Sequence, residues 1–147
     1  MVIYLDTSAT VKLVTAEQES PALINWLNVH PDEHLATSAI GHIELIRAAT
    51  RAGAAATAAA RNIASTIDTL VLTDTIAAIA ATIPPAELRT LDAIHLATAH
   101  AHRRSLTAFC VYDRRLLEAA ESQDLPTVSP RNGTSLTEAP PAARPLG

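Results

Sequence analysis

Four of the 15 acidic residues in this 147-residue sequence lie against apolar neighbours near the ends of predicted helices or strands. They are Asp6, Glu44, Asp92 and Asp113. A carboxylate in such surroundings is costly unless it is paired or lies near a cation. Carboxylate oxygens are the hard ligands that Mg²⁺ and Mn²⁺ prefer, and such an ion can activate water and neutralise charge on a phosphate. The pattern therefore predicts a metal site suited to phosphate chemistry.

Three of these acids also have a purely structural interpretation. Asp6 and Asp113 could cap the helices that follow them. Asp92 could interact favourably with the helix dipole in the first turn of its own helix. What favours a shared site is that the predicted topology brings the acids to one edge of a sheet.

Glu44 is placed by its neighbours on a predicted helix. Ile40 and Ala48 lie four residues before and after it, so the wheel places Glu44 in the apolar sector. The structural alternative is an ion pair with Arg47 or Arg51 at helical spacing.

Ser8 lies two residues after Asp6 and is interpreted as a hydroxyl that hydrogen-bonds Asp6 or a metal-bound water. The alternative is a helix cap. A serine hydrolase is not favoured, because the GxSxG motif is absent. A zinc site is not favoured either, since no HExxH or Cys/His pattern occurs, and no glycine-rich nucleotide-binding loop is found.

The formal net charge of −4 argues weakly against a nucleic-acid partner. However, all but Lys12 of the 11 basic residues are arginine, which holds phosphate well. We interpret Arg89, Arg114 and Arg115 as candidate substrate-binding residues. A solvated helix face is the alternative for the last two.

The elements that must position these residues follow from the hydrophobic pattern, which alternates short strands with helices. Strands are predicted over residues 2–5, 34–37, 70–72, 107–112 and 126–128. Helices are predicted over residues 7–14, 20–29, 39–52, 54–69, 75–82, 90–104 and 113–122. This alternation predicts a parallel sheet with helices on both faces. Asp6 and Asp113 then follow strands at the carboxyl edge, where open α/β sheets bind ligands.

The length fits one domain, predicted over residues 1–130. Residues 131–147 are rich in Pro, Gly, Ser and Thr and are expected to form a poorly ordered tail. The start of the chain lacks a signal peptide's basic segment, and no apolar run reaches the ~20 residues that span a bilayer. The single Cys110 excludes an internal disulfide. We therefore expect a cytoplasmic protein with no membrane partner.

Four blocks of the sequence resemble, in order, the PIN-domain family, and within it the VapC-type toxins of bacterial toxin–antitoxin modules. The blocks are VIYLDTSATVKL, TSAIGHIELIRA, LRTLDAIHLATA and FCVYDRRLLEAAESQDLPTVSP. Together they extend over residues 2–130 and place the family's acids and hydroxyl at Asp6, Glu44, Asp92, Asp113 and Ser8. One departure is Tyr112, which stands where many PIN domains carry Thr or Ser.

The resemblance implies a three-layer α/β/α sandwich around a short, mostly parallel sheet of four to five strands. It implies an endoribonuclease dependent on Mg²⁺ or Mn²⁺ that cleaves structured RNA, mainly transfer or ribosomal RNA. Such toxins are commonly homodimers, and a cognate VapB-type antitoxin occludes their active site. The alternatives are a PIN-like scaffold without activity and a metal-dependent DNA nuclease or phosphatase.

In the mechanism that we expect, Asp6, Asp92 and Asp113 hold the metal, and Glu44 binds it directly or through water. Clustered carboxylates repel one another. Without metal, at least one of them should therefore bind a proton more readily than a free acid does. Alternatively, the acids should lie apart or pair with arginine.

Overall fold

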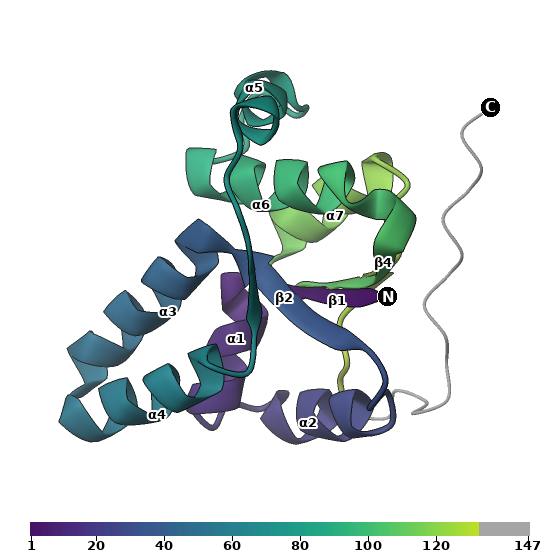
Figure 1. Ribbon diagram of the computed structural model, residues 1–147. Coiled ribbons are helices and arrows are strands. Elements are labelled where there is room, and N and C mark those ends of the chain that lie inside the picture. Colours follow the sequence, from purple (N-terminus) through teal and green to yellow (C-terminus); the bar gives the residue numbers. More distant parts are fainter. Residues whose placement is uncertain (133–147) are drawn as a thin grey trace.

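The computed structural model describes residues 1–132 and contains a five-stranded sheet in the order β3-β2-β1-β4-β5 (Figure 1). Every strand pairs in parallel with its neighbours. The strands are β1 (Val2–Leu5), β2 (His34–Ser38), β3 (Asp68–Leu70), β4 (Leu106–Cys110) and β5 (Thr127–Val128). The predicted parallel sheet is thus confirmed.

Helices cover both faces of this sheet. They are α1 (Thr7–Val14), α2 (Ser20–Asn28), α3 (Ala39–Ala52), α4 (Ala54–Ala64), α5 (Asp74–Thr82), α6 (Thr90–Ala101) and α7 (Arg114–Ser122), with a short 3₁₀ helix η1 (Arg103–Ser105). Figure 1 shows α5, α6 and α7 on one side of the strands and α1 to α4 on the other. This is the three-layer α/β/α sandwich that the family resemblance implied.

Alternating side chains of the central strands supply the core on both faces. Ile3 and Leu5 of β1 pack in the same cluster as Trp26 of α2. Tyr4, between them, packs in the other cluster with Phe109 of β4. All five side chains are at most 1% exposed. Burial on both faces explains why β1 reads as an uninterrupted apolar run.

The order of the strands reverses direction at β1. The chain runs from β1 outward to β2 and β3, and then returns to β4 on the other side of β1. The ends of β1 and β4 are joined, since Leu5 pairs with Cys110 and the Asp6 N–H donates to the Cys110 carbonyl at 3.2 Å. Ligands of open α/β sheets bind at such a reversal of strand order.

Several boundaries differ from the sequence prediction. β4 ends at Cys110 and not at residue 112, and α6 ends at Ala101 and not at residue 104. The third strand was expected over residues 70–72, but β3 ends at Leu70, and α4 ends at Ala64 instead of continuing to residue 69. The reason is that β2 ends at Ser38, which pairs with Leu70 and caps α3. Val71 therefore has no β2 partner, and its side chain is 67% exposed.

The predicted tail, residues 131–147, lies almost wholly outside the described residues and stays a prediction. Within residues 1–132, no helix combines the length and apolar character that crossing a bilayer requires.

Candidate active site

Asp6 is the buried centre of the carboxyl edge of the sheet. It directly follows β1 and caps α1, with Oδ1 accepting the Ala9 N–H at 3.0 Å. The same oxygen accepts the Ser8 hydroxyl at 2.6 Å. The Asp6 residue is only 3% exposed. Asp6 is therefore a helix cap, as the structural interpretation allowed, but its burial goes beyond what a cap requires.

Ser8 connects Asp6 to the loop after β4. Its Oγ donates to Asp6 and accepts the Tyr112 N–H at 3.0 Å. Because Asp6 is the cap of α1, the helix-cap alternative for Ser8 is wrong. Ser8 instead ties Asp6 to the chain segment just before Asp113, and in this way fixes the two strand ends relative to each other.

The environment of Asp6 favours its protonated form. Burial raises the pKa of Asp6 from 3.8 to about 6. The Ser8 hydrogen bond, the charge of His95 and the Ala9 N–H lower this pKa, while the charge of Asp92 raises it further. The prediction that one carboxyl group binds a proton more readily is confirmed. However, desolvation is the larger cause and repulsion by Asp92 the smaller one.

Asp92 lies in the first turn of α6, as predicted, and is paired with an arginine. The Arg89 Nε donates to Asp92 Oδ2 at 3.2 Å, and the Asp92 side chain is 18% exposed. The negative charge of Asp92 contributes a small upward shift to the pKa of Asp6. Arg89 also helps to lower the pKa of Glu44, so this candidate arginine pairs with one predicted acid and acts electrostatically on a second.

Glu44 belongs to a hydrogen-bond network that the sequence did not predict. His95 Nε2 lies 2.8 Å from Glu44 Oε1, and the Thr7 hydroxyl donates to the same oxygen at 2.8 Å. His95 Nδ1 lies 2.6 Å from the Tyr4 hydroxyl, which also accepts the Ser38 N–H at 3.2 Å. These bonds are satisfied together when Tyr4 donates to Nδ1 and the proton of His95 resides on Nε2, facing Glu44.

The consequence for Glu44 is a carboxylate held in one position. Burial acts to raise the pKa of Glu44, but hydrogen bonds from His95 and Thr7 and the charges of His95 and Arg89 outweigh it, so the net direction is downward. Within residues 1–132, the close contact of the Glu44 carboxylate with a basic side chain is with His95 and not with Arg47 or Arg51.

The helix-wheel placement of Glu44 was only partly right. The buried residues of α3 are Gly41, Leu45 and Ala49, whereas the Glu44 side chain is 27% exposed, at the rim of the helix. His95, on α6, was visible in the sequence only as a histidine one turn after Asp92.

Asp113 caps α7 after the end of β4. Its Oδ1 accepts the Leu116 N–H at 2.9 Å, so the structural interpretation of this acid is also realised. Arg114 pairs with Glu118 at 3.1 Å, and its side chain is 89% exposed. Arg115 lines a hollow with Glu118 and Pro85. The roles of Arg114 and Arg115 in substrate binding stay predictions.

The carboxylate oxygens of Asp6 and Asp92 are donors of the kind that a hard divalent cation takes, and their part in binding a metal stays a prediction. Asp6 uses Oδ1 for both of its hydrogen bonds within the described residues. Across residues 1–132, no three His, Cys, Asp or Glu side chains lie close enough together to form a ready-made metal cluster. Glu44 and Asp113 are each held by other bonds, so their part in binding a metal stays a prediction.

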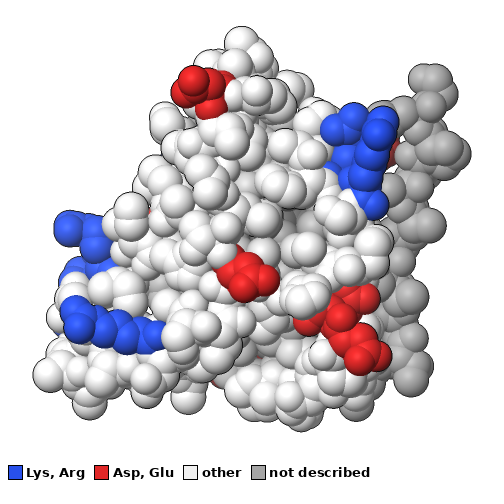
Figure 2. Space-filling model, in the orientation of Figure 1, with Lys and Arg blue, Asp and Glu red and all other residues white. Residues whose placement is uncertain are grey.

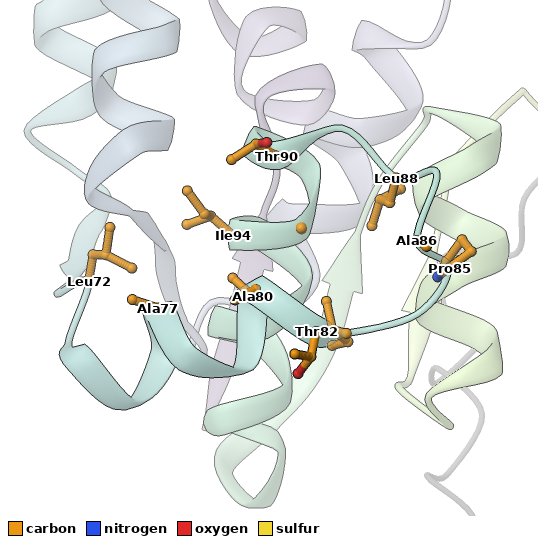
Figure 3. A pocket seen from close by; sticks show the side chains of 12 residues that line it. Leu72, Ala77, Ala80, Thr82, Pro85, Ala86, Leu88, Thr90 and Ile94 are labelled. Atoms are coloured by element: carbon orange, nitrogen blue, oxygen red, sulfur yellow. The ribbon is translucent and has the colours of Figure 1, made fainter.

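A separate hollow of about 430 Å³ lies between α5 and α6 (Figure 3). Its labelled residues include Leu72, Ala80, Leu88 and Ile94, and its lining holds no charged side chain. It therefore lacks the groups needed for acid–base or metal chemistry, and the carboxyl edge of the sheet remains the better candidate for an active site.

Comparisons with known proteins agree with this geometry. Residues 3–122 match the PIN domain. Ribonuclease VapC47 of Mycobacterium tuberculosis is 44% identical over 131 residues, covering 87% of this chain and 96% of the relative. Ribonuclease VapC35 and Ribonuclease VapC46 of the same species are 42% and 40% identical, over 87% of this chain and 96% and 97% of their own lengths. The chain belongs to the PIN-domain family.

Proposed function

We propose that this protein is the toxin of a toxin–antitoxin pair and acts as an endoribonuclease that depends on Mg²⁺ or Mn²⁺. The observation that carries the proposal is Asp6, a carboxylate buried at the point where the strand order reverses, with a pKa that the charge of Asp92 helps to raise. The relatives that cover nearly the same length are ribonucleases by name, which supports RNA as the substrate.

In this proposal Asp6, Asp92 and Asp113 supply oxygen ligands, and Glu44 contributes directly or through water. When bound, the cation supplies an activated water and neutralises charge on the phosphoryl oxygens. The protein's own part is to hold the acids still. Ser8 fixes Asp6, and the hydrogen bonds from His95 and Thr7 fix Glu44.

The reaction is hydrolysis of a phosphodiester bond. The oxygen of water bonds to phosphorus, the bond from phosphorus to the 3′ oxygen breaks, and the leaving oxygen takes up a proton. Because the RNA 2′-hydroxyl is not the nucleophile in this scheme, the products carry 5′-phosphate and 3′-hydroxyl ends.

The partners in the proposal are RNA and a second protein. The RNA is structured transfer or ribosomal RNA, which proteins recognise through shape as well as sequence. A cognate VapB-type antitoxin covers the carboxyl edge of the sheet, and the toxin is a homodimer. A neighbouring gene for a short DNA-binding protein would support the antitoxin part.

The proposal is tested by incubating the purified protein with total RNA, single-stranded DNA and branched DNA, with Mg²⁺, with Mn²⁺ or with EDTA. We expect cleavage of RNA alone, and only with a divalent ion. Cleavage of DNA in preference to RNA would favour a DNA nuclease. No cleavage of any substrate under all three conditions would favour a scaffold without activity.

A further inference from the structure

A hollow of about 350 Å³ beside the carboxyl edge of the sheet carries two arginines of α3. We name it the α3 groove; its charged lining residues are Glu44, Arg47 and Arg51. Thr7, which binds Glu44, also lines it. The groove therefore begins at the proposed active site and continues along α3 for about 10 Å, since seven residues of helix separate Glu44 from Arg51.

The two arginines are available to a ligand. Both are exposed, and within residues 1–132 neither guanidinium group forms an ion pair with an acid. Glu44, the acid at the right helical spacing, is already held by His95 and Thr7. Figure 2 shows basic side chains at the end of the molecule formed by α3 and α4, while the acidic side chains on this face lie mostly elsewhere.

The spacing and surroundings of these arginines suit a polyanionic strand. Residues four apart on a helix lie about 6 Å from each other on the same face, so Arg47 and Arg51 can contact successive phosphates. Ile43 and Leu91 border the groove with 58% and 46% of their surface exposed. Apolar side chains and arginine planes are surfaces on which unstacked bases can pack.

The low overall charge strengthens this assignment. With a formal net charge of −4, the protein as a whole does not attract a polyanion. Binding of RNA must therefore depend on local groups of arginine that have no acidic partner. Arg47 and Arg51, in the groove that also holds Glu44, form such a group, whereas Arg114 is paired with Glu118.

We infer that Arg47 and Arg51 bind the phosphate backbone of the RNA strand that enters the active site. This inference rests on the proposed ribonuclease function and adds to it the route of the substrate. Arg47 and Arg51 are substrate-binding residues here and take no part in the chemical step.

The test compares the double variant Arg47→Gln, Arg51→Gln with the matched control Arg104→Gln. Arg104 is exposed and lies in η1, which precedes β4 at the opposite, amino edge of the sheet. Binding of labelled bulk transfer RNA is measured in EDTA, so that no cleavage occurs, at several salt concentrations. Cleavage of the same RNA with Mg²⁺ then gives kcat and KM.

We expect the double variant to bind RNA roughly ten- to a hundredfold more weakly. The negative slope of log affinity against log salt should become shallower by about two. KM should rise by a similar factor while kcat stays within about twofold. The control should match the wild type in both assays. Affinity and salt slope equal to those of the control would overturn the inference.

A second copy of the chain is the competing occupant of the α3 groove. Sedimentation of the wild type and the double variant at equal concentrations separates the two cases. An unchanged oligomeric state supports the RNA assignment, and a shift to a smaller species would overturn it. Failure of the wild type to cleave RNA would instead contradict the proposed function. The binding assay in EDTA is independent of that outcome, because it measures affinity without cleavage.

Discussion

Asp6 combines a requirement for negative charge with a location that disfavours it. At pH 7, above its pKa of about 6, the Asp6 carboxyl group is mostly ionised although the residue is only 3% exposed. It accepts hydrogen bonds from one hydroxyl and one backbone amide. Such a residue reduces the stability of the folded state until a cation compensates it. This is the conflict between stability and function that catalytic sites often contain.

The first prediction at the residue scale concerns the variant Asp6→Asn without metal. The pKa of Asp6 is about 6 in the folded protein and 3.8 ordinarily, so the folded state binds the proton more tightly. The free energy of unfolding of the wild type therefore falls as pH rises from about 4 to 6, and the contribution of Asp6 stays constant above that range. The neutral amide removes this penalty, which amounts to at most about 3 kcal/mol.

Thermal unfolding in EDTA at pH 4 and pH 8 measures the effect. The variant should melt above the wild type at pH 8, and the difference should shrink at pH 4, where Asp6 is protonated in the folded state and partly protonated in the unfolded state. Cleavage of RNA by the variant should fall at least about a hundredfold. A melting temperature at or below that of the wild type at pH 8 would show that the buried charge is not costly.

The second prediction at this scale concerns His95, the 1% exposed histidine that connects Tyr4 with Glu44. His95→Leu leaves the Tyr4 hydroxyl without its acceptor and leaves Glu44 held by the Thr7 hydroxyl alone. We expect a loss of about 1–3 kcal/mol in the free energy of unfolding. Cleavage should fall by about ten- to a hundredfold, the usual cost of losing a partner that orients a metal ligand.

Urea unfolding and steady-state kinetics measure these losses. His95→Gln, whose amide can still donate to Glu44, should recover part of the activity. His34→Leu, at an exposed position of β2, serves as the control and should leave both quantities near the wild type. Full activity of His95→Leu would mean that the position of Glu44 does not matter for the reaction.

At the scale of elements, α3 is the helix that brings Glu44 to α6. The approach is close at Gly41, where an added Cβ would lie 2.2 Å from Thr37 Oγ1 and 3.1 Å from His95 Cε1. Both neighbours are at most 1% exposed, so neither can move freely. Glycine at this position lets α3 pack against β2 and α6, and in this way sets the distance between Glu44 and His95.

Gly41→Ala should therefore be destabilising although alanine is the better helix former by about 1 kcal/mol. Overpacking of this kind costs roughly 1–3 kcal/mol. Cleavage should fall as well, because α3 moves away from His95. Gly53→Ala is the matched control, since its φ of 116° makes the change strained while no atom lies within 4 Å of the added Cβ.

The control should lose stability but keep its kcat, measured at a temperature where both variants are folded. Equal kcat values for Gly41→Ala and the wild type would contradict the idea that α3 positions a catalytic group.

The existence and type of the helices and strands are the features that the sequence pattern predicts best. Short apolar runs bounded by capping residues predict β1 and β4, and a parallel sheet then puts the acids that follow them at one edge. Tyr4 looked like an ordinary core residue of β1, because its bond to His95 joins positions 91 residues apart. Only packing of α6 against the sheet creates that contact, and no local pattern encodes it.

At the scale of the whole molecule, the strand order decides which edge becomes a site. The alternation of strands and helices predicts a parallel sheet, but not the order β3-β2-β1-β4-β5. The same limit applies to the four acids. Their positions along the chain are predictable, whereas the pairing of Asp92 with Arg89 and of Glu44 with His95 depends on the assembled fold.

A metal at this edge would stabilise the folded protein as a whole. Millimolar Mg²⁺ should raise the melting temperature of the wild type by about 5–10 °C if its concentration is near 100 times Kd. Asp6→Asn should show little change, and sodium chloride at equal ionic strength controls for screening. Equal shifts in the two proteins would place any bound Mg²⁺ outside the carboxyl edge.

The most direct test of the central claim is an analysis of the ends that the purified protein leaves on cleaved RNA in Mg²⁺, with Asp6→Asn as the parallel sample. We predict 5′-phosphate and 3′-hydroxyl ends from the wild type and no new ends from Asp6→Asn. Ends carrying 2′,3′-cyclic phosphate, or the same products from Asp6→Asn, would contradict hydrolysis by water at the carboxylate edge.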